Sequence, residues 1–189
     1  MFNSAKNTVR TWMQPLSKVF SHTNPNLITI AGLLFALAAG VCFASKHLFL
    51  GGALIILSGF FDVLDGTIAR GTNRATPYGG FLDSVSDRYA DAAILIGIMY
   101  GCTIAMPYPD VAWFWGAVAL VGSFMVSYTR ARAEAAGANA AVGMAERAER
   151  LIIIAAGAFT GYLNIAVFVV AIITHITIIQ RLVFVKKQL

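Results

Sequence analysis

Long apolar runs separated by short polar or small-residue segments make up most of this chain. Runs of about 20 apolar residues are long enough to cross a bilayer as helices. Turn signals divide the runs, among them Lys46 with His47, and Pro107 with Pro109. The pattern predicts six membrane-spanning helices, at about residues 25–45, 48–70, 79–101, 111–132, 145–162 and 164–185.

The segment before the first run, residues 1–22, has a different pattern. Large apolar side chains recur there at helical spacing, with three cations between them: Val9, Trp12, Met13, Leu16, Val19 and Phe20, and Lys6, Arg10 and Lys18. This pattern predicts an amphipathic helix lying in the membrane interface, and a disordered basic tail is the alternative. The segment lacks the continuous apolar stretch of a cleavable signal peptide.

The composition supports a membrane protein. Of the 189 residues, 58% are hydrophobic and 12% are charged, whereas soluble domains have about 25% charged residues. Backbone groups in a bilayer must be satisfied internally, so the spans are helices. We therefore expect an all-α integral membrane protein. A single domain would fill residues 1–189, with the six-helix bundle at 25–187.

The positions of the basic residues predict how the chain is oriented. If six helices cross the membrane, 13 of the 14 Lys and Arg residues fall on the side of the N-terminus, and only Lys46 falls on the other. Positive residues mark the cytoplasmic side, so both termini and the charged helix ends are expected there. Because the net charge of +5 is concentrated at helix ends, it suits anionic lipids or substrates rather than nucleic acid.

Four aspartates lie within or beside the apolar runs of the second and third spans. Asp62 and Asp65 are three residues apart, and Asp83 and Asp87 are four apart, so each pair shares one helix face. The short connection makes the two helices antiparallel neighbours and brings the pairs together. Four carboxylates are ligands that hard divalent cations prefer, and two Mg²⁺ ions, or Mn²⁺ in their place, would balance the charge. An ion transporter that uses buried aspartates is an alternative of another class.

Small residues and one arginine surround the aspartates. A glycine within a helix, as at Gly66, costs about 1 kcal/mol relative to alanine, which suggests that another group approaches the backbone closely. Ala69 and Gly79 give the same indication, and Arg70 can bind a phosphate. With two metals, these features suggest a substrate that contains a pyrophosphate.

A second charged cluster lies at the predicted cytoplasmic ends of the fourth and fifth spans. It contains four arginines and three interleaved glutamates: Arg130, Arg132, Arg147 and Arg150, with Glu134, Glu146 and Glu149. The arginines have two interpretations, which the spacing leaves open. They anchor the helices on the cytoplasmic side, or they form a second anion site for a phosphate on an acceptor.

The aspartates belong to a longer pattern of eight positions: Asp62-x2-Asp65-Gly66-x2-Ala69-Arg70-x8-Gly79-x3-Asp83-x3-Asp87. It resembles the signature of the CDP-alcohol phosphotransferase family without departure. The resemblance implies transfer of a phosphoalcohol from a CDP-linked donor to an alcohol, with release of CMP. It implies two metals held by the four aspartates, with Asp87 also the general base, and nucleotide contacts by Gly66, Ala69, Arg70 and Gly79. Asn26 and Thr29, in the stretch NPNLIT, are expected near the nucleotide.

Three further stretches indicate the acceptor. LDSVSDR at residues 82–88, SYTRARAE at 127–134 and ERAERL at 146–151 resemble the branch of the family that uses inositol phosphate, and particularly its archaeal ether-lipid members. The resemblance implies phosphate binding by Arg130, Arg132, Arg150 and Arg147. The expected partners are CDP-dialkylglycerol or CDP-diacylglycerol, inositol phosphate, membrane lipids and a second copy of the chain. Glycerol 3-phosphate or another alcohol is the alternative acceptor.

Overall fold

The computed structural model describes residues 23–72, 74–102 and 109–189, and within these ranges the regular secondary structure is all α-helix, joined by loops. The predicted all-α class is therefore confirmed, and no strand is present among the described residues. The predicted interfacial helix at residues 1–22 lies outside them. The helices are α2 (Pro25–Ala44), α3 (Leu48–Gly71), α4 (Pro77–Cys102), α5 (Pro109–Ala135), α6 (Arg147–Thr160) and α7 (Leu163–Lys186).

Local sequence signals account for several helix ends. The Asn24 side chain accepts a hydrogen bond of 3.0 Å from the backbone N–H of Asn26, and Pro25 fills the first position of α2, as expected at a helix start. The hydroxyl of Thr76 accepts from the N–H of Gly79 at 3.0 Å and caps α4 in the same way. Gly161 ends α6 with a φ of 79°, a left-handed conformation that suits glycine.

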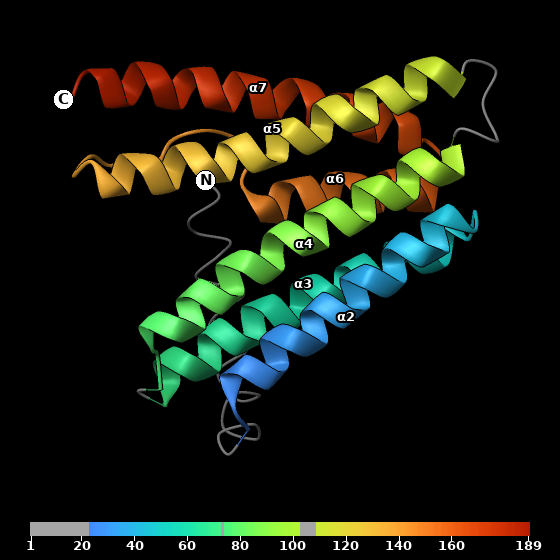
Figure 1. Ribbon diagram of the computed structural model, residues 1–189. Helices are drawn as coiled ribbons and strands as arrows, with labels where there is room; N and C mark the ends of the chain where they lie inside the picture. The colour runs from blue at the N-terminus through green and yellow to red at the C-terminus, as the bar shows by residue number, and fades with distance from the viewer. Residues whose placement is uncertain (1–22, 73, 103–108) are drawn as a thin grey trace.

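The helices form two groups of three, which Figure 1 shows as a lower and an upper set. In the lower set α2 packs against both α3 and α4, and in the upper set α7 packs against both α5 and α6. The contacts of α3 with α6 and of α4 with α5 join the two sets. The aspartate-bearing helices α3 and α4 therefore lie against the helices that carry the arginine cluster.

Three helices, α2, α3 and α7, are long and apolar enough to cross a membrane by length and composition. The helix predicted at residues 145–162 is shorter than expected, because α6 has only 14 residues. At about 1.5 Å per residue, α6 is shorter than a bilayer core of about 30 Å. Its first turn carries the charged residues Arg147, Glu149 and Arg150, so the helix begins at the arginine cluster.

Glycines allow α2 and α4 to approach each other closely. A Cβ atom added to Gly97 would lie 2.1 Å from the backbone oxygen of Gly40, and one added to Gly101 would lie 2.0 Å from that of Phe43. Small residues permit this kind of close backbone packing in membrane proteins. The crossing fixes α4, and with it the two aspartates near its N-terminal end, relative to α2.

Replacing Gly97 by alanine should therefore destabilise the protein. The added methyl group meets backbone rather than a movable side chain, and overpacking of this kind costs about 1–3 kcal/mol. Thermal unfolding in detergent would measure the loss. Gly80→Ala, on the same helix, is the matched control, since its Cβ would meet nothing within 4 Å. Equal unfolding temperatures for the two variants would contradict this account of the packing.

Candidate active site

Three of the four predicted aspartates converge at the facing surfaces of α3 and α4. Carboxylate oxygens of Asp62, Asp83 and Asp87 all lie within 4.8 Å of one another, and all three residues are partly buried. The i, i+4 spacing of Asp83 and Asp87 places both on the face of α4 that meets Asp62. The predicted juxtaposition of carboxylates from two neighbouring helices is present in the structure.

Asp65, the fourth aspartate, is buried beside this group and makes a contact with α2. The hydroxyl of Thr29 donates a hydrogen bond of 2.5 Å to its carboxylate. Asp65 lines a small cavity together with Asp62, Asp87 and Thr29. Thr29, which the sequence analysis expects near the nucleotide, thus lies next to the aspartates and orients Asp65.

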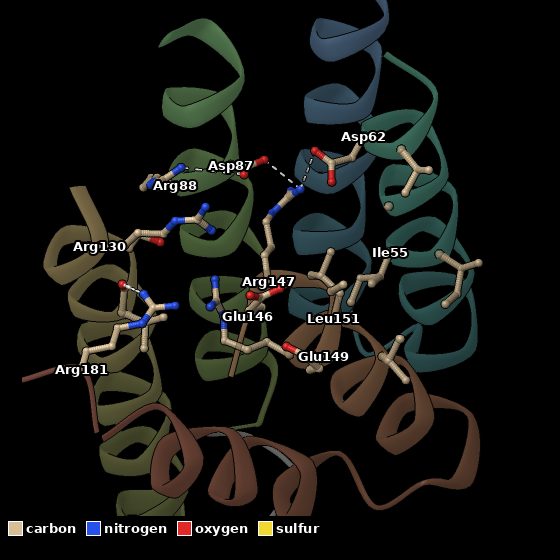
Figure 2. Close-up of a pocket in the computed structure, with 18 of the residues that line it drawn as sticks. Ile55, Asp62, Asp87, Arg88, Arg130, Glu146, Arg147, Glu149, Leu151 and Arg181 are labelled. Atoms are coloured by element: carbon tan, nitrogen blue, oxygen red, sulfur yellow. Dashed lines mark hydrogen bonds and ion pairs between the residues drawn. The ribbon is translucent and has the colours of Figure 1, made fainter. Parts of the chain in front are cut away.

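An arginine from the other set of helices reaches into the carboxylate group. Nη1 of Arg147, in the first turn of α6, lies 2.8 Å from Asp87 and 3.1 Å from Asp62, and Figure 2 shows its side chain extending between these two residues. The contacts are close charge pairs rather than well-aligned hydrogen bonds, since Nη1 has no partner of good hydrogen-bond geometry. Sequence reasoning placed Arg147 at a separate anion site and did not anticipate this pairing.

The charges in this group fit a divalent cation. Three ionised carboxylates and the guanidinium of Arg147 leave a formal charge of −2. Arg88 approaches Asp87 only to 3.7 Å and also donates to the backbone oxygen of Ser84. Carboxylate oxygens from three side chains suit Mg²⁺ or Mn²⁺. Asp62, Asp83 and Asp87 are therefore the residues that would hold a metal, with Asp65 adjacent.

The predicted nucleotide-binding residues lie on the two helices that carry the aspartates and in the first turns of α2. A Cβ atom added to Gly66 would lie 2.8 Å from Nη2 of Arg70. The absence of a side chain at Gly66 therefore leaves room for the guanidinium of Arg70. A Cβ on Gly79 would lie 3.3 Å from the side-chain oxygen of Asn26, which brings the start of α2 to the start of α4. Ala69 is partly buried on the last turn of α3. Polar side chains thus approach the backbone closely at Gly66 and Gly79.

A cavity of about 610 Å³ opens next to the carboxylates. Among the described residues, six arginines line it against four acidic side chains, Asp62, Asp87, Glu146 and Glu149. The arginines come from five helices: Arg70, Arg88, Arg130, Arg147, Arg150 and Arg181. The cavity therefore joins a carboxylate cluster, able to hold a metal, to a wall with an excess of positive charge, able to hold an anion.

The four arginines predicted to bind the acceptor differ in their surroundings. Arg147 and Arg150 line the cavity, and Arg150 is only 3% exposed. Arg130 also lines it, with Nε 3.0 Å from a carboxylate oxygen of Glu134. Arg132 is exposed in the last turn of α5 and does not belong to the lining. The role predicted for Arg132 has no support from this geometry and stays a prediction.

Arg181 is a cavity residue that the sequence analysis counted only as a cytoplasmic charge. It is 2% exposed on α7, and its guanidinium donates to the backbone oxygens of Val142, at 3.0 Å, and Val126. These bonds tie α7 to α5 and to the loop before α6. One sequence signal could have identified it, because an arginine inside an apolar helix is rare and often functional.

Comparison with known proteins identifies the family of the chain. The profile of the CDP-alcohol phosphatidyltransferase family matches residues 22–183. An archaetidylinositol phosphate synthase from Methanothermobacter thermautotrophicus is 42% identical, covering 100% of this chain and 96% of that protein. A similar protein from Pyrococcus horikoshii is 43% identical over 87% of this chain and 85% of its own length.

Solved structures of an enzyme with a similar sequence have a fold similar to that of this chain. The phosphatidylinositol phosphate synthase of Mycobacterium tuberculosis with CDP-DAG bound is 32% identical, with a TM-score of 0.80 over 90% of this chain and 92% of that one. The same enzyme in complex with manganese and citrate is 30% identical, with a TM-score of 0.84 over 92% of this chain and 88% of that one.

The chain belongs to the CDP-alcohol phosphatidyltransferase family. It is an enzyme of that class, and the resemblance of the eight-position signature is confirmed at the family level. Family membership leaves no support for the ion-transporter alternative. The relatives named above are archaetidylinositol phosphate and phosphatidylinositol phosphate synthases. Their names support the choice of acceptor proposed below.

Proposed function

We propose that this protein transfers the phosphatidyl or archaetidyl group of a CDP-lipid to inositol phosphate and releases CMP. The observation that carries the proposal is the single cavity in which the carboxylate cluster of α3 and α4 meets arginines of α5, α6 and α7. The pyrophosphate of a CDP-lipid needs metal ions held by the carboxylates. A phosphorylated acceptor needs the arginines. The names of the relatives support inositol phosphate over other acceptors.

The donor half of the site would bind two divalent cations, Mg²⁺ or Mn²⁺, through Asp62, Asp65, Asp83 and Asp87. The manganese complex of the mycobacterial enzyme supports a divalent metal. When bound, the metals supply charge stabilisation at the pyrophosphate. Asn26, Thr29, Gly66, Ala69, Arg70 and Gly79 would surround the cytidine nucleotide, and Arg70 would orient its phosphate by charge-assisted hydrogen bonds.

The chemical step needs a base beside the acceptor. We assign this role to Asp87, which lines the cavity and lies at its junction with the carboxylate cluster. Its carboxylate would take the proton of an inositol hydroxyl as the oxygen attacks the lipid-bearing phosphorus in line. The new phosphorus–oxygen bond forms as the bond to CMP breaks, so CMP leaves with the electron pair.

Arg130, Arg147 and Arg150 would bind the phosphate of the acceptor from the wall of the cavity. Planar guanidinium groups suit phosphate because they donate two parallel hydrogen bonds. Arg181 lies in the same wall and is added to this group on the basis of its position. Holding the phosphate at a fixed place fixes which hydroxyl faces Asp87, and such positioning lowers the barrier.

The proposal includes a membrane topology. Six helices would cross the cytoplasmic membrane with both termini inside, so that the cavity opens to the cytoplasm and the lipid tails stay in the bilayer. Exposed apolar side chains along α2, such as Leu27, Leu34 and Val41, support contact with lipid or with a second copy in a homodimer. Labelling of single cysteines introduced at the two ends of α7 in intact cells would test the orientation.

Arg130→Ala should raise the KM for inositol phosphate and leave the KM for the CDP-lipid unchanged. A hydrogen bond to a charged group is worth about 1.5–3 kcal/mol, which corresponds to roughly a tenfold rise or more. Steady-state CMP release would measure both constants. Arg132→Ala, two residues away and outside the cavity lining, is the matched control. An acceptor KM of the wild-type value in Arg130→Ala would remove Arg130 from the acceptor site.

A further inference from the structure

We infer that Asp91, an aspartate outside the eight-position signature, is a positioning residue that holds Arg147 and Arg150 in the cavity wall and so sets where the acceptor's phosphate binds. Asp91 lies one helical turn beyond Asp87 on α4. The inference rests on the proposed function, because it concerns the acceptor half of the same site. It assigns a distinct task to a carboxylate that the metal-binding group does not include.

Both oxygens of Asp91 are engaged by arginines of α6. Oδ2 accepts a hydrogen bond of 2.5 Å from Nη2 of Arg150. Oδ1 lies 3.5 Å from Nε of Arg147, which is a charge pair without a hydrogen bond. Arg150 also donates from Nη1 to the backbone oxygen of Ala145 at 2.8 Å. Its guanidinium is thus held from two directions, by α4 and by the residue before the helix.

Burial makes this arrangement rigid. Asp91 is 7% exposed and Arg150 is 3% exposed, so water has little access to either side chain as an alternative hydrogen-bond partner. Removing one member of a buried pair leaves an uncompensated charge and is strongly unfavourable. The guanidinium of Arg150 therefore has one favoured position, and it still lines the cavity.

A purely stabilising role explains the pair less well than a positioning role. Buried ion pairs are often no more stable than apolar side chains of similar volume, because both charges lose their hydration. An apolar pair at these positions would hold α4 and α6 together equally well. It would, however, remove the guanidinium of Arg150 from the cavity wall and the carboxylate beside the Nε of Arg147.

The same carboxylate also connects the two halves of the site. Arg147 contacts Asp91 through Nε while its Nη1 lies beside Asp62 and Asp87. Asp91 therefore places a counter-charge at the inner end of this guanidinium, whose Nη1 lies at the boundary between the carboxylates and the cavity. A phosphate bound there would be placed relative to Asp87 by a contact that does not itself touch the substrate.

The test is a comparison of acceptor and donor constants in Asp91 variants. Asp91→Asn removes the charge, and Asp91→Glu keeps the charge but moves it, which protects against loss of folding. We expect the KM for inositol phosphate to rise in both, by up to about a hundredfold, the cost of misplacing a positioning group, with the KM for the CDP-lipid unchanged. Ser123→Ala, which removes a buried polar group of α5 outside the cavity lining, is the control.

A double-mutant cycle separates positioning from a general structural effect. Because Asp91 acts largely through Arg150, Asp91→Asn combined with Arg150→Met should raise the acceptor KM by clearly less than the product of the two separate effects. Additive effects of the two substitutions would overturn this route. Folded Asp91→Asn and Asp91→Glu proteins with the acceptor KM of the wild type, or with equal changes for both substrates, would overturn the inference as a whole.

A binding measurement keeps this inference separate from the proposed function. Calorimetry with inorganic phosphate and with inositol phosphate, in the absence of CDP-lipid, should show weaker binding to Asp91→Asn than to the wild type. If the wild type released CMP only with an unphosphorylated acceptor, the proposed function would fail, and weaker phosphate binding by Asp91→Asn would still support the positioning role. Equal phosphate binding by the two proteins would contradict it.

Discussion

Asp87→Asn should reduce the release of CMP by about 100-fold to 10,000-fold, the range that a general base contributes. Asparagine has nearly the shape of aspartate but cannot take the proton of the acceptor hydroxyl. It also removes one of three carboxylates that lie within 4.8 Å of one another. Single-turnover measurements of CMP release at saturating CDP-lipid and acceptor would report the loss, because they separate chemistry from binding.

Two controls make the Asp87 result interpretable. Ser84→Ala, on the same helix and outside both cavity linings, should keep the wild-type rate. Binding of Mn²⁺, measured by electron paramagnetic resonance, separates the two roles of Asp87, since a lost base alone leaves the affinity for metal largely intact. A folded Asp87→Asn protein with a substantial fraction of the wild-type rate would remove Asp87 from the base role.

Asp62→Ala should abolish metal-dependent activity by weakening metal binding. Asp62 supplies the only carboxylate of the converging group that comes from α3, so its loss leaves that group with two carboxylates, both on α4, and Asp65 beside them. Even outer-shell partners of a metal are worth about 10–100-fold in affinity, and loss of a direct ligand should exceed that. Titration with Mn²⁺ would measure the affinity without reliance on turnover.

Arg147 provides a further check on the Asp62 result. Its Nη1 is shared between Asp62 and Asp87, so Asp62→Ala removes one counter-ion but leaves the other. The variant should therefore stay folded, with a thermal unfolding temperature close to that of the wild type in the absence of metal. Unchanged Mn²⁺ affinity in a folded Asp62→Ala protein would show that the metal is held elsewhere.

Much of the fold and of the carboxylate cluster could be predicted from the sequence because the signals are local. Pro25 indicated where α2 begins, and α4 begins at Pro77, close to the start predicted at residue 79. The spacing within each aspartate pair fixed a shared helix face, and the short connection between α3 and α4 brought Asp62 to Asp83 and Asp87. Little beyond helix geometry is needed for these steps.

The arginine contacts depend on packing between distant segments, and the sequence did not predict them. Arg147 reaches Asp62 because α6 packs on α3, and Asp91 pairs with Arg150 across 59 positions of the chain. Arg181 was missed for the same reason, since its partners Val126 and Val142 lie on another helix and in a loop. Side-chain periodicity reports which face of a helix is polar but not which helix will meet that face.

The most direct test of the proposed function is CMP release by the purified protein with Mg²⁺ and a CDP-lipid, across a panel of acceptors. The panel would contain inositol 1-phosphate, glycerol 3-phosphate, inositol and serine, each with CDP-dialkylglycerol and with CDP-diacylglycerol. We predict turnover with inositol phosphate and none, or far less, with the others. Turnover with glycerol 3-phosphate, inositol or serine but not with inositol phosphate would contradict the acceptor assignment, and no turnover with any acceptor by folded protein would contradict the proposed reaction.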